Sequence, residues 1–234
     1  LDGHNMNTGG EGKHTPDVSR LETQMWFFYR ASMFIDIGYE SIHLGSTPSM
    51  SDVDSKQGYK GWKRITDTIH EYGKKHARRG WILLNAHAEN FKTPNDELIF
   101  DFSAWLIQGM VPKHETAGAP AIGNPQELEI NIGGNGALYG KTLGGKHPAG
   151  YEVDRALYVV ELDNYGINNE MLNQPEPKAG GMYPWGIEEI GWFAKQPSNY
   201  RRYWLDYAYF RINEIDNFYG HITMPCIRNG GSVE

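Results

Sequence analysis

Apolar, strand-like runs alternate along this chain with amphipathic helical segments, and this alternation limits its possible folds more than any other feature. Such alternation is typical of parallel β-strands joined by helical crossovers. Polar residues close nearly every run, which favours a barrel whose strand ends form one mouth. A doubly wound dinucleotide fold is less favoured, because no Gly-rich turn opens the first helix. Strands are predicted at residues 41–45, 81–87, 98–104, 156–163, 187–194 and 221–226.

Three long helices are predicted from apolar residues spaced three and four positions apart. The first begins at residues 15–17, with Thr15 as N-cap and Pro16 at the first helical position, and runs to Gly38. The second carries Trp62, Ile65, Ile69 and Tyr72 and ends in a basic turn before Gly80. The third is capped by Ser198. These helices supply the crossovers that parallel strands require.

The predicted fold class is α/β, an incomplete (β/α)8 TIM-barrel-like domain. Six strands are predicted in 234 residues, whereas a closed barrel has eight strands and about 250 residues. We therefore expect residues 1–234 to form one barrel domain that lacks its first βα units. Another chain or a missing segment is expected to complete it. Residues 105–154 are rich in Gly and Pro and are predicted to form a long irregular loop beside the mouth.

Charge and composition exclude several classes of partner. The net charge is -7, and no basic cluster is longer than residues 74–79, so neither nucleic acid nor an anionic membrane is an expected partner. No apolar run approaches the roughly 20 residues that span a bilayer. One cysteine, Cys226, excludes an intrachain disulfide and a cysteine-cluster metal site. The aromatic content of 13% suits stacking on sugar rings and core packing alike.

Two carboxylates, Glu161 and Asp163, end the most apolar predicted strand and are followed by Asn164. Side chains alternate along a strand, so both carboxylates point to the same face. Buried carboxylates without partners are costly, and in parallel sheets ligands bind at the carboxyl ends of strands. This pattern indicates a functional site. The alternative is that both are ordinary loop-edge charges paired with Arg155 or a lysine.

Polar residues also end or interrupt the earlier strands. His43 lies between Ile42 and Leu44, either at a site or as a satisfied core histidine. Asn85 and His87 share one face of their strand, where they can hydrogen-bond a hydroxyl-rich ligand or hold the following loop in place.

Asp101 has phenylalanines on both sides. It faces the barrel axis if those rings face the helices, and otherwise it is a paired surface charge. Trp105 lies four residues after Asp101, and it is either a platform for a sugar ring or part of the core.

Motifs for other chemistries are incomplete. Residues 133–142 approach a phosphate-binding loop, but Asn135 replaces the first required glycine and no helix can follow directly. There is no Gly-x-Ser-x-Gly elbow, His-x-His pair or His-Glu-x-x-His sequence. No cofactor is expected.

Four segments, residues 34–43, 76–81, 160–166 and 192–197, resemble bacterial glycoside-hydrolase-like (β/α)8 barrel proteins. The resemblance extends over most of residues 17–228 and rests on strand order and sequence texture. It implies a carbohydrate ligand and a secreted, periplasmic or cell-surface location. It transfers no catalytic residue to this chain.

The first hypothesis is therefore a glycosidase-like barrel that acts on an oligosaccharide. Glu161 is the expected general acid, because apolar neighbours raise the pKa of a carboxyl group, and Asp163 or Asp101 is the expected nucleophile or base. Hydroxyl groups are expected to be held by His43, Asn85, His87 and Asn164, and sugar faces by Trp105, Trp185 and Trp192.

Two alternatives remain open. In a metal-dependent barrel hydrolase or isomerase, His43, His87, Asp101, Glu161 and Asp163 would converge on one divalent ion. The other alternative is a carbohydrate-binding barrel without catalysis.

Overall fold

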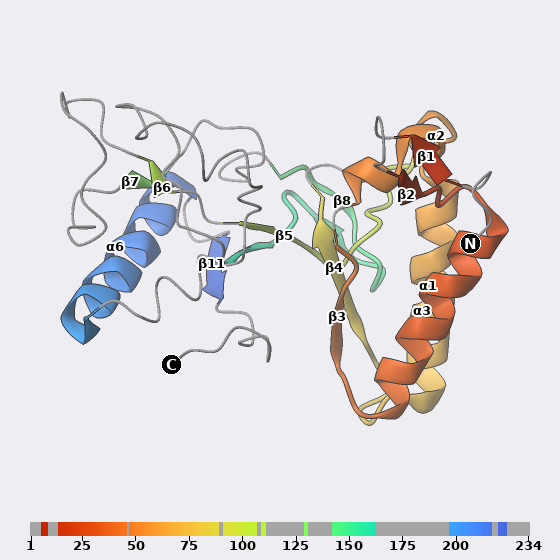
Figure 1. Cartoon of the computed structure of the whole chain (residues 1–234), viewed down its shortest axis with the longest axis horizontal. Helices are drawn as coiled ribbons and strands as arrows, with labels where there is room; N and C mark the ends of the chain where they lie inside the picture. The colour runs from red at the N-terminus through yellow and green to blue at the C-terminus, as the bar shows by residue number, and fades with distance from the viewer. Residues whose placement is uncertain are drawn as a thin grey trace. The chain divides into compact units, whose positions relative to one another are not determined.

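The computed structural model describes residues 6–8, 14–45, 47–88, 91–106, 109–110, 129–130, 142–161, 197–216 and 220–223. The chain divides into two units. Unit 1 comprises Leu1–Ala104 and Thr142–Leu157, and unit 2 comprises Trp105–Lys141 and Tyr158–Glu234. The helices and strands of both are coloured in chain order in Figure 1.

The described residues of unit 1 form parallel strands, two long α-helices, one short α-helix and two small antiparallel pairs of strands. β3 pairs with β4 and β4 pairs with β5, in both cases parallel, while β1 pairs with β2 and β8 with β9 antiparallel. The elements are β1 (Met6–Thr8), β2 (His14–Pro16), α1 (Leu21–Asp36), β3 (Ser41–His43), the 3-10 helix η2 (Pro48–Met50), α2 (Asp52–Lys56), α3 (Lys60–His76), β4 (Leu83–His87), β5 (Phe102–Leu106, which starts in this unit), β8 (Gly145–Lys146) and β9 (Glu152–Val153).

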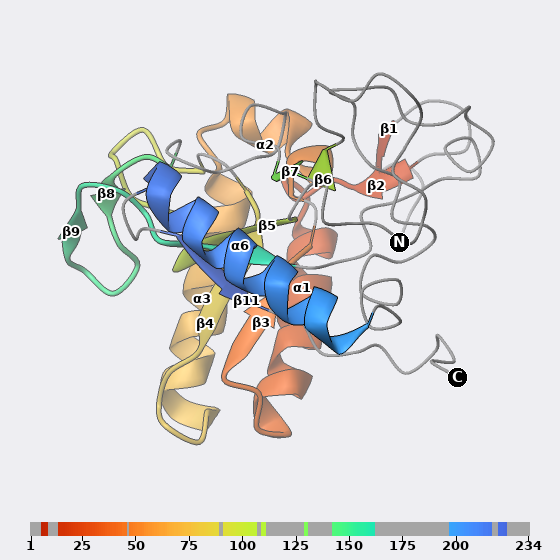
Figure 2. The ribbon, with the colours of Figure 1, turned by 90° about the vertical axis from the view of Figure 1, so that its left-hand side faces the viewer.

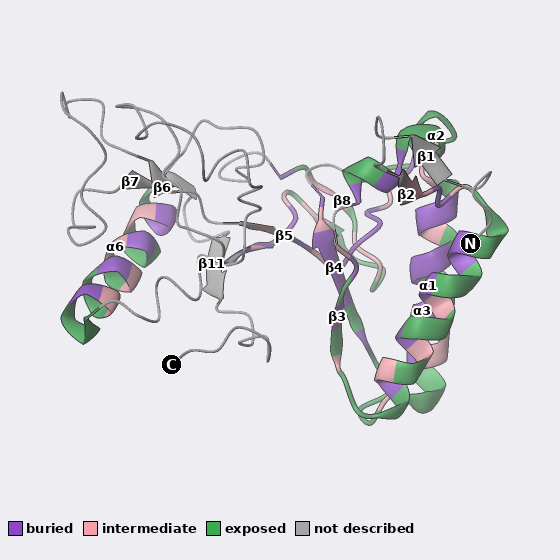
Figure 3. Ribbon diagram, viewed as in Figure 1, coloured by how far each residue is buried: buried purple, intermediate pink, exposed green. Residues whose placement is uncertain are grey.

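Helices α1 and α3 lie side by side and pack on the same face of β3 and β4 (Figure 1 and Figure 2). The core between them is buried, as the purple segments of these four elements show in Figure 3. Alternation along each strand places Ile42 of β3 and Leu84 and Ala86 of β4 in this core. The core residues are Val18, Phe27, Ala31, Ile35, Ile42, Leu44, Met50, Trp62, Ile65, Ile69, Ile82, Leu84, Ala86, Ala88, Ile99 and Phe100.

The start of α1 differs from the prediction. Residues 14–16 form β2, and the helix begins at Leu21, after Arg20, which makes no side-chain cap. The Thr15 hydroxyl donates to the carbonyl of Ser49, and the Asp17 carboxylate accepts from the backbone N–H of Ser19. The hydrogen bond to Ser49 thus uses the hydroxyl of Thr15, the side chain that was expected to cap the helix.

Helix α3 begins where Asp54 of α2 caps it. The buried Asp54 carboxylate accepts from the backbone N–H groups of Gly61 and Trp62, at 2.7 and 3.0 Å. Two of the N–H groups that a helix leaves unpaired at its start are thereby satisfied, and the negative charge lies at the positive end of the helix dipole. A Cβ at Gly61 would lie 2.3 Å from the carbonyl oxygen of Val18, so only glycine fits.

Unit 2 contains a parallel βαβ arrangement. β10 (Tyr158–Glu161) pairs parallel with β11 (Gly220–Thr223), and α6 (Ser198–Asp216) packs on β11. β6 (Gly109–Met110) pairs antiparallel with β7 (Glu129–Ile130). The buried apolar residues of α6 recur every four positions and form its inner face: Tyr200, Trp204, Ala208 and Ile212.

The structure is mixed α/β with parallel strands, as the sequence predicts, and no closed barrel is present among the described residues. The predicted strand 98–104 is displaced, because β5 begins at Phe102. Part of the predicted irregular region instead forms the β8–β9 hairpin. The predicted strand 187–194 lies outside the described residues.

Candidate functional site

The face of the unit 1 sheet opposite α1 and α3 is polar at its carboxyl end. Because Ile42, Leu84 and Ala86 point into the core, their neighbours on β3 and β4 point the other way. This places His43 of β3 beside Asn85 of β4, its direct partner in the parallel register. His87, two residues further along β4, completes the group, called here the His43–Asn85–His87 cluster.

His43 contacts both of the other side chains. His43 Nδ1 lies 2.7 Å from Asn85 Oδ1, and the rings of His43 and His87 are 4.5 Å apart in an edge-to-face arrangement. Asn85 Nδ2 also donates to Ser41 Oγ over 3.4 Å. His43 is exposed and His87 half-buried, whereas Asn85 is buried beneath them. Asn85 is therefore a buried support that orients an exposed imidazole.

The contact with Asn85 orients the His43 ring. An amide oxygen only accepts hydrogen bonds, so the neutral ring bonds to Asn85 in the tautomer whose proton is on Nδ1. The exposed His43 imidazole is thus held in one orientation at the end of β3.

The loops around the cluster are held by hydrogen bonds. The Thr47 hydroxyl donates to the carbonyl of His87 over 2.9 Å, and the His87 N–H donates to the carbonyl of Gly45 over 3.0 Å. Ser51 Oγ donates to the Thr47 carbonyl and accepts from Trp62 Nε1 of α3. This chain of bonds ties the ends of β3 and β4 to the core, which preorganises the cluster.

Asp101 lies elsewhere in unit 1. It immediately precedes β5 and is bonded to Leu84, near the start of β4: the Leu84 N–H donates to Asp101 Oδ2 over 2.7 Å, and the Asp101 N–H donates to the Leu84 carbonyl. The same carboxylate oxygen lies 2.8 Å from Nε2 of His70, a residue of α3. Asp101 therefore faces the helices, and the structure separates it from His43 and His87.

Two histidines that sequence reasoning missed surround Asp101. His70 is the residue after the buried Ile69, on the edge of the apolar face of α3. His147 Nε2 donates to the Asp101 carbonyl over 2.8 Å, because its Nδ1 accepts from the Ala149 N–H. His147 lies in a region predicted to be irregular. No spacing rule connects either histidine with Asp101 in the sequence.

The remaining predicted site residues belong to unit 2 or lie outside the described residues. Glu161 is the last residue of β10, opposite Thr223 of β11, and so occupies the carboxyl end of its strand as predicted. Trp105 is half-buried on β5. Four predicted residues lie outside the described residues: Asp163, Asn164, Trp185 and Trp192.

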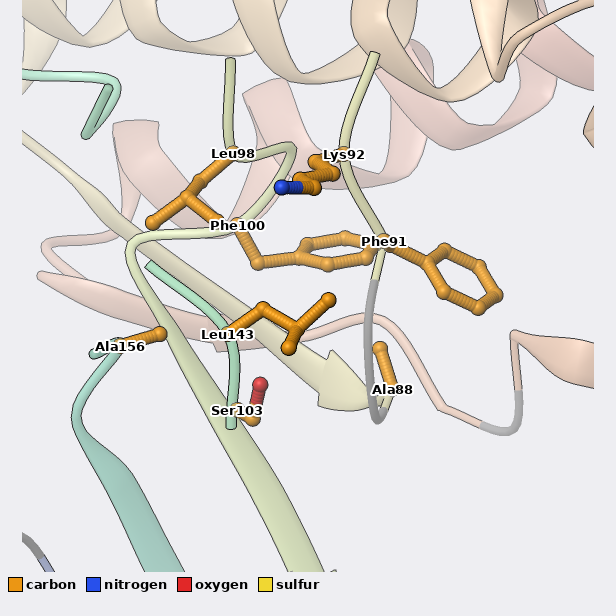
Figure 4. Close-up of a pocket in the computed structure, with 8 residues that line it drawn as sticks. All are labelled: Ala88, Phe91, Lys92, Leu98, Phe100, Ser103, Leu143 and Ala156. Carbon is orange, nitrogen blue, oxygen red and sulfur yellow. The ribbon is translucent and has the colours of Figure 1, made fainter. Parts of the chain in front are cut away.

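A small pocket lies in unit 1 between the segment after β4, the start of β5 and the β8–β9 region. Figure 4 shows the side chains that line it, among which Ser103 supplies a hydroxyl at one end. About 20 Å3 is accessible to water, which is room for one molecule and too little for a sugar ring. The lining residues are Ala88, Phe91, Lys92, Leu98, Phe100, Ser103, Leu143 and Ala156.

Within the described ranges, no three histidine, cysteine or acidic side chains are arranged to hold a metal ion. None of the described helices combines the length and apolarity needed to span a bilayer. The chain matches no protein-family model, no curated protein and no solved structure. A function for this chain therefore rests on its own residues.

Proposed function

We propose that this protein is a glycoside-hydrolase-like (β/α)8 barrel that acts on or binds an oligosaccharide at the carboxyl ends of its strands. The observation that carries the proposal is the His43–Asn85–His87 cluster, which presents hydrogen-bonding groups at one strand end on the face opposite the helices. Sugars are recognised through hydroxyl groups, and an exposed imidazole beside a buried amide supplies hydrogen-bonding groups of the kind that bind them.

The arrangement of unit 1 supports the barrel. β3, β4 and β5 are neighbours in the order of the sequence, and both α1 and α3 cover the same face. A barrel places all its helices outside and its strand order follows the chain, whereas a doubly wound sheet carries helices on both faces. The polar cluster then lies on the inner face, at the end where barrel enzymes bind substrates.

Catalysis in this proposal uses Glu161 as general acid and Asp163 as nucleophile or base. Glycoside hydrolysis needs two carboxyl groups about 5–5.5 Å apart for retention or about 6.5–9.5 Å for inversion. Residues two apart on a strand have Cα atoms roughly 6.5–7 Å apart, which is compatible with both. Asp101 is the weaker candidate, because Leu84 and His70 already use its carboxylate. Asn164 would bind hydroxyl groups, and Trp105, Trp185 and Trp192 would stack on sugar faces.

A metal-dependent hydrolase or isomerase is the second candidate, and the proximity of two imidazoles favours it. The ring centroids of His43 and His87 lie 4.5 Å apart, and imidazole nitrogens are common metal ligands. Imidazole and carboxylate ligands together suit divalent ions such as Zn²⁺. Glu161 and Asp163 would then be ligands rather than an acid and a nucleophile. A binding protein without catalysis is the third candidate.

Substitution of Glu161 by Gln tests the proposal. A positioned general acid contributes about 10²–10⁴-fold in rate, so hydrolysis of a panel of aryl glycosides and oligosaccharides by Glu161→Gln should fall by that factor. Glu152→Gln, on the exposed strand β9, is the matched control and should retain full activity.

The three candidates give different results. Full hydrolysis by Glu161→Gln would exclude Glu161 as the acid. Loss of activity in the parent protein on treatment with a chelator, restored by Zn²⁺, would favour the metal site. Binding of an oligosaccharide without turnover by the parent protein would favour the binding function.

A further inference from the structure

Helix α1 carries two apolar faces, and among the described residues of unit 1 one of these faces is packed and the other is exposed. Phe27, Ala31 and Ile35 are buried against α3 and the sheet. A second row of large apolar side chains runs along the outside at intervals of four residues. The row is Leu21, Met25, Tyr29, Met33 and Ile37, the last being the C-cap residue, and it is called here the α1 ridge.

The α1 ridge is exposed along its whole length. The exposed fractions are 62% for Leu21, 62% for Met25, 60% for Tyr29, 51% for Met33 and 73% for Ile37. Taking about 200 Å2 for the full surface of a large side chain, the ridge exposes about 600 Å2 of mostly apolar surface. That is at the upper end of the roughly 300–600 Å2 found for the largest patch on a typical monomer, and patches of this size mark interaction sites.

The order of residues in the ridge is the same from either end. An aliphatic residue, a methionine, a tyrosine, a methionine and an aliphatic residue follow one another. A two-fold axis through Tyr29 therefore pairs Leu21 with Ile37 and Met25 with Met33. A two-fold interface uses the same patch on both subunits and requires such self-complementarity.

The spacing also fits the commonest packing of two helices. Rows of residues four apart form ridges inclined to the helix axis, and two such ridges pack side by side when the helices cross at about −50°. Two copies of the α1 ridge would together bury at most about 1,200 Å2, the whole exposed surface of both, which is the lower limit of stable, specific interfaces of about 1,200–2,000 Å2.

We propose that a second copy of this chain covers the α1 ridge, so that the protein is a two-fold dimer with Tyr29 at its centre. A membrane surface suits the ridge less well. Amphipathic helices that lie on membranes carry several Lys or Arg residues beside their apolar face. The polar residues beside the ridge include the acidic Glu22 and Asp36, and Arg30 lies over the rings of Trp26 and Phe34.

Light scattering after size-exclusion chromatography of the full chain tests the dimer. The parent protein should have twice the mass of one chain at micromolar concentrations. Tyr29→Glu places two carboxylates, one from each chain, at the centre of the interface. The dissociation constant of the dimer should rise at least about 30-fold, since central aromatic residues contribute most of the binding energy of such interfaces. Thr68→Glu, which adds the same charge to the exposed face of α3, should leave the dimer unchanged.

A cross-linking experiment provides a second readout, which does not require a substitution that destabilises the interface. Because Cys226 is the single cysteine, the double substitution Tyr29→Cys with Cys226→Ser leaves one thiol, placed on the proposed axis. Mild oxidation should then give a covalent dimer, because two residues beside a two-fold axis meet the Cα separation of about 4.4–6.8 Å that a disulfide requires. Thr68→Cys with Cys226→Ser should stay a single chain.

Two results would overturn the proposal. One is a parent protein with the mass of one chain at concentrations up to about 200 µM, in which case no dimer forms within the range expected for an interface of this size. The other is a dimer that persists unchanged in Tyr29→Glu while circular dichroism shows the fold intact. In the first case, binding of the monomeric parent protein to anionic vesicles would identify a membrane surface as the partner of the α1 ridge.

Discussion

Replacement of Asp101 by Ala separates a structural role from a catalytic one. The Asp101 carboxylate is buried and holds two partners on one oxygen, the Leu84 N–H at 2.7 Å and His70 Nε2 at 2.8 Å. The side chain of His70 is itself mostly buried, with 18% exposed. Removal of the carboxylate leaves a buried backbone donor and a buried imidazole without their acceptor.

The expected loss of stability follows from these two contacts. A hydrogen bond to a charged group contributes about 1.5–3 kcal/mol, and the Asp101 carboxylate takes part in two such bonds. Asp101→Ala should therefore lower the free energy of unfolding by about 3–5 kcal/mol. Asp101→Asn retains one acceptor oxygen and should cost about 1–2 kcal/mol, and His70→Ala, which leaves the Leu84 contact in place, about 1–3 kcal/mol.

Urea unfolding followed by circular dichroism measures these differences. With a slope of about 2 kcal/mol per molar urea, Asp101→Ala should lower the midpoint by about 1.5–2.5 M. The double variant with His70→Ala should lose less than the sum of the two single losses, because both substitutions remove the same contact. A midpoint for Asp101→Ala within about 0.3 M of the parent value would refute this reasoning. Loss of activity in a fully stable Asp101→Asn would restore Asp101 as a catalytic candidate.

Two further outcomes are expected. Asp54→Ala should destabilise the protein by about 2–4 kcal/mol, since two N–H groups of α3 lose a buried acceptor; thermal unfolding measures this, and an unchanged midpoint would contradict the capping role. Hydrogen bonds to Asp36 at 2.9 and 3.1 Å raise the pKa of Tyr72 above its usual value of 10.0. Because the unfolded state ionises first, this contribution to stability is present below about pH 10 and is lost as the pH rises through the raised pKa. An ultraviolet titration of the parent protein against Tyr72→Phe should show this, and an ordinary or lowered pKa would contradict it.

The parts of the fold that the sequence predicts are those in which local pattern and tertiary packing agree. In α3, Trp62, Ile65 and Ile69 recur at helical spacing and are all buried in the core. The alternation along β4 correctly put Asn85 and His87 on one face, because Leu84 and Ala86 pack against the helices on the other. That His43 lies beside Asn85 depends on the parallel register of β3 and β4. The hydrophobic pattern of either strand alone does not contain this register.

The mispredicted parts are those in which a polar side chain bonds to a distant backbone group. Thr15 resembles a helix cap but donates to Ser49, 34 residues away. Asp101 resembles a residue within a strand, but its carboxylate accepts from Leu84 and turns towards α3. Such long-range bonds leave no periodic signal in the sequence, so His70 and His147 were missed as partners of Asp101.

The central claim is that an oligosaccharide binds at the His43–Asn85–His87 cluster, and a titration of imidazole nuclear magnetic resonance signals tests it directly. Signals of His43 and His87 would be assigned from the variants His43→Ala and His87→Ala, and His70 and His147 serve as internal controls in the same unit. We expect an oligosaccharide from a broad panel to shift the His43 and His87 signals in a saturable manner and to leave His70 and His147 unchanged. Saturable binding that shifts neither His43 nor His87, or that is undiminished in both alanine variants, would contradict the account.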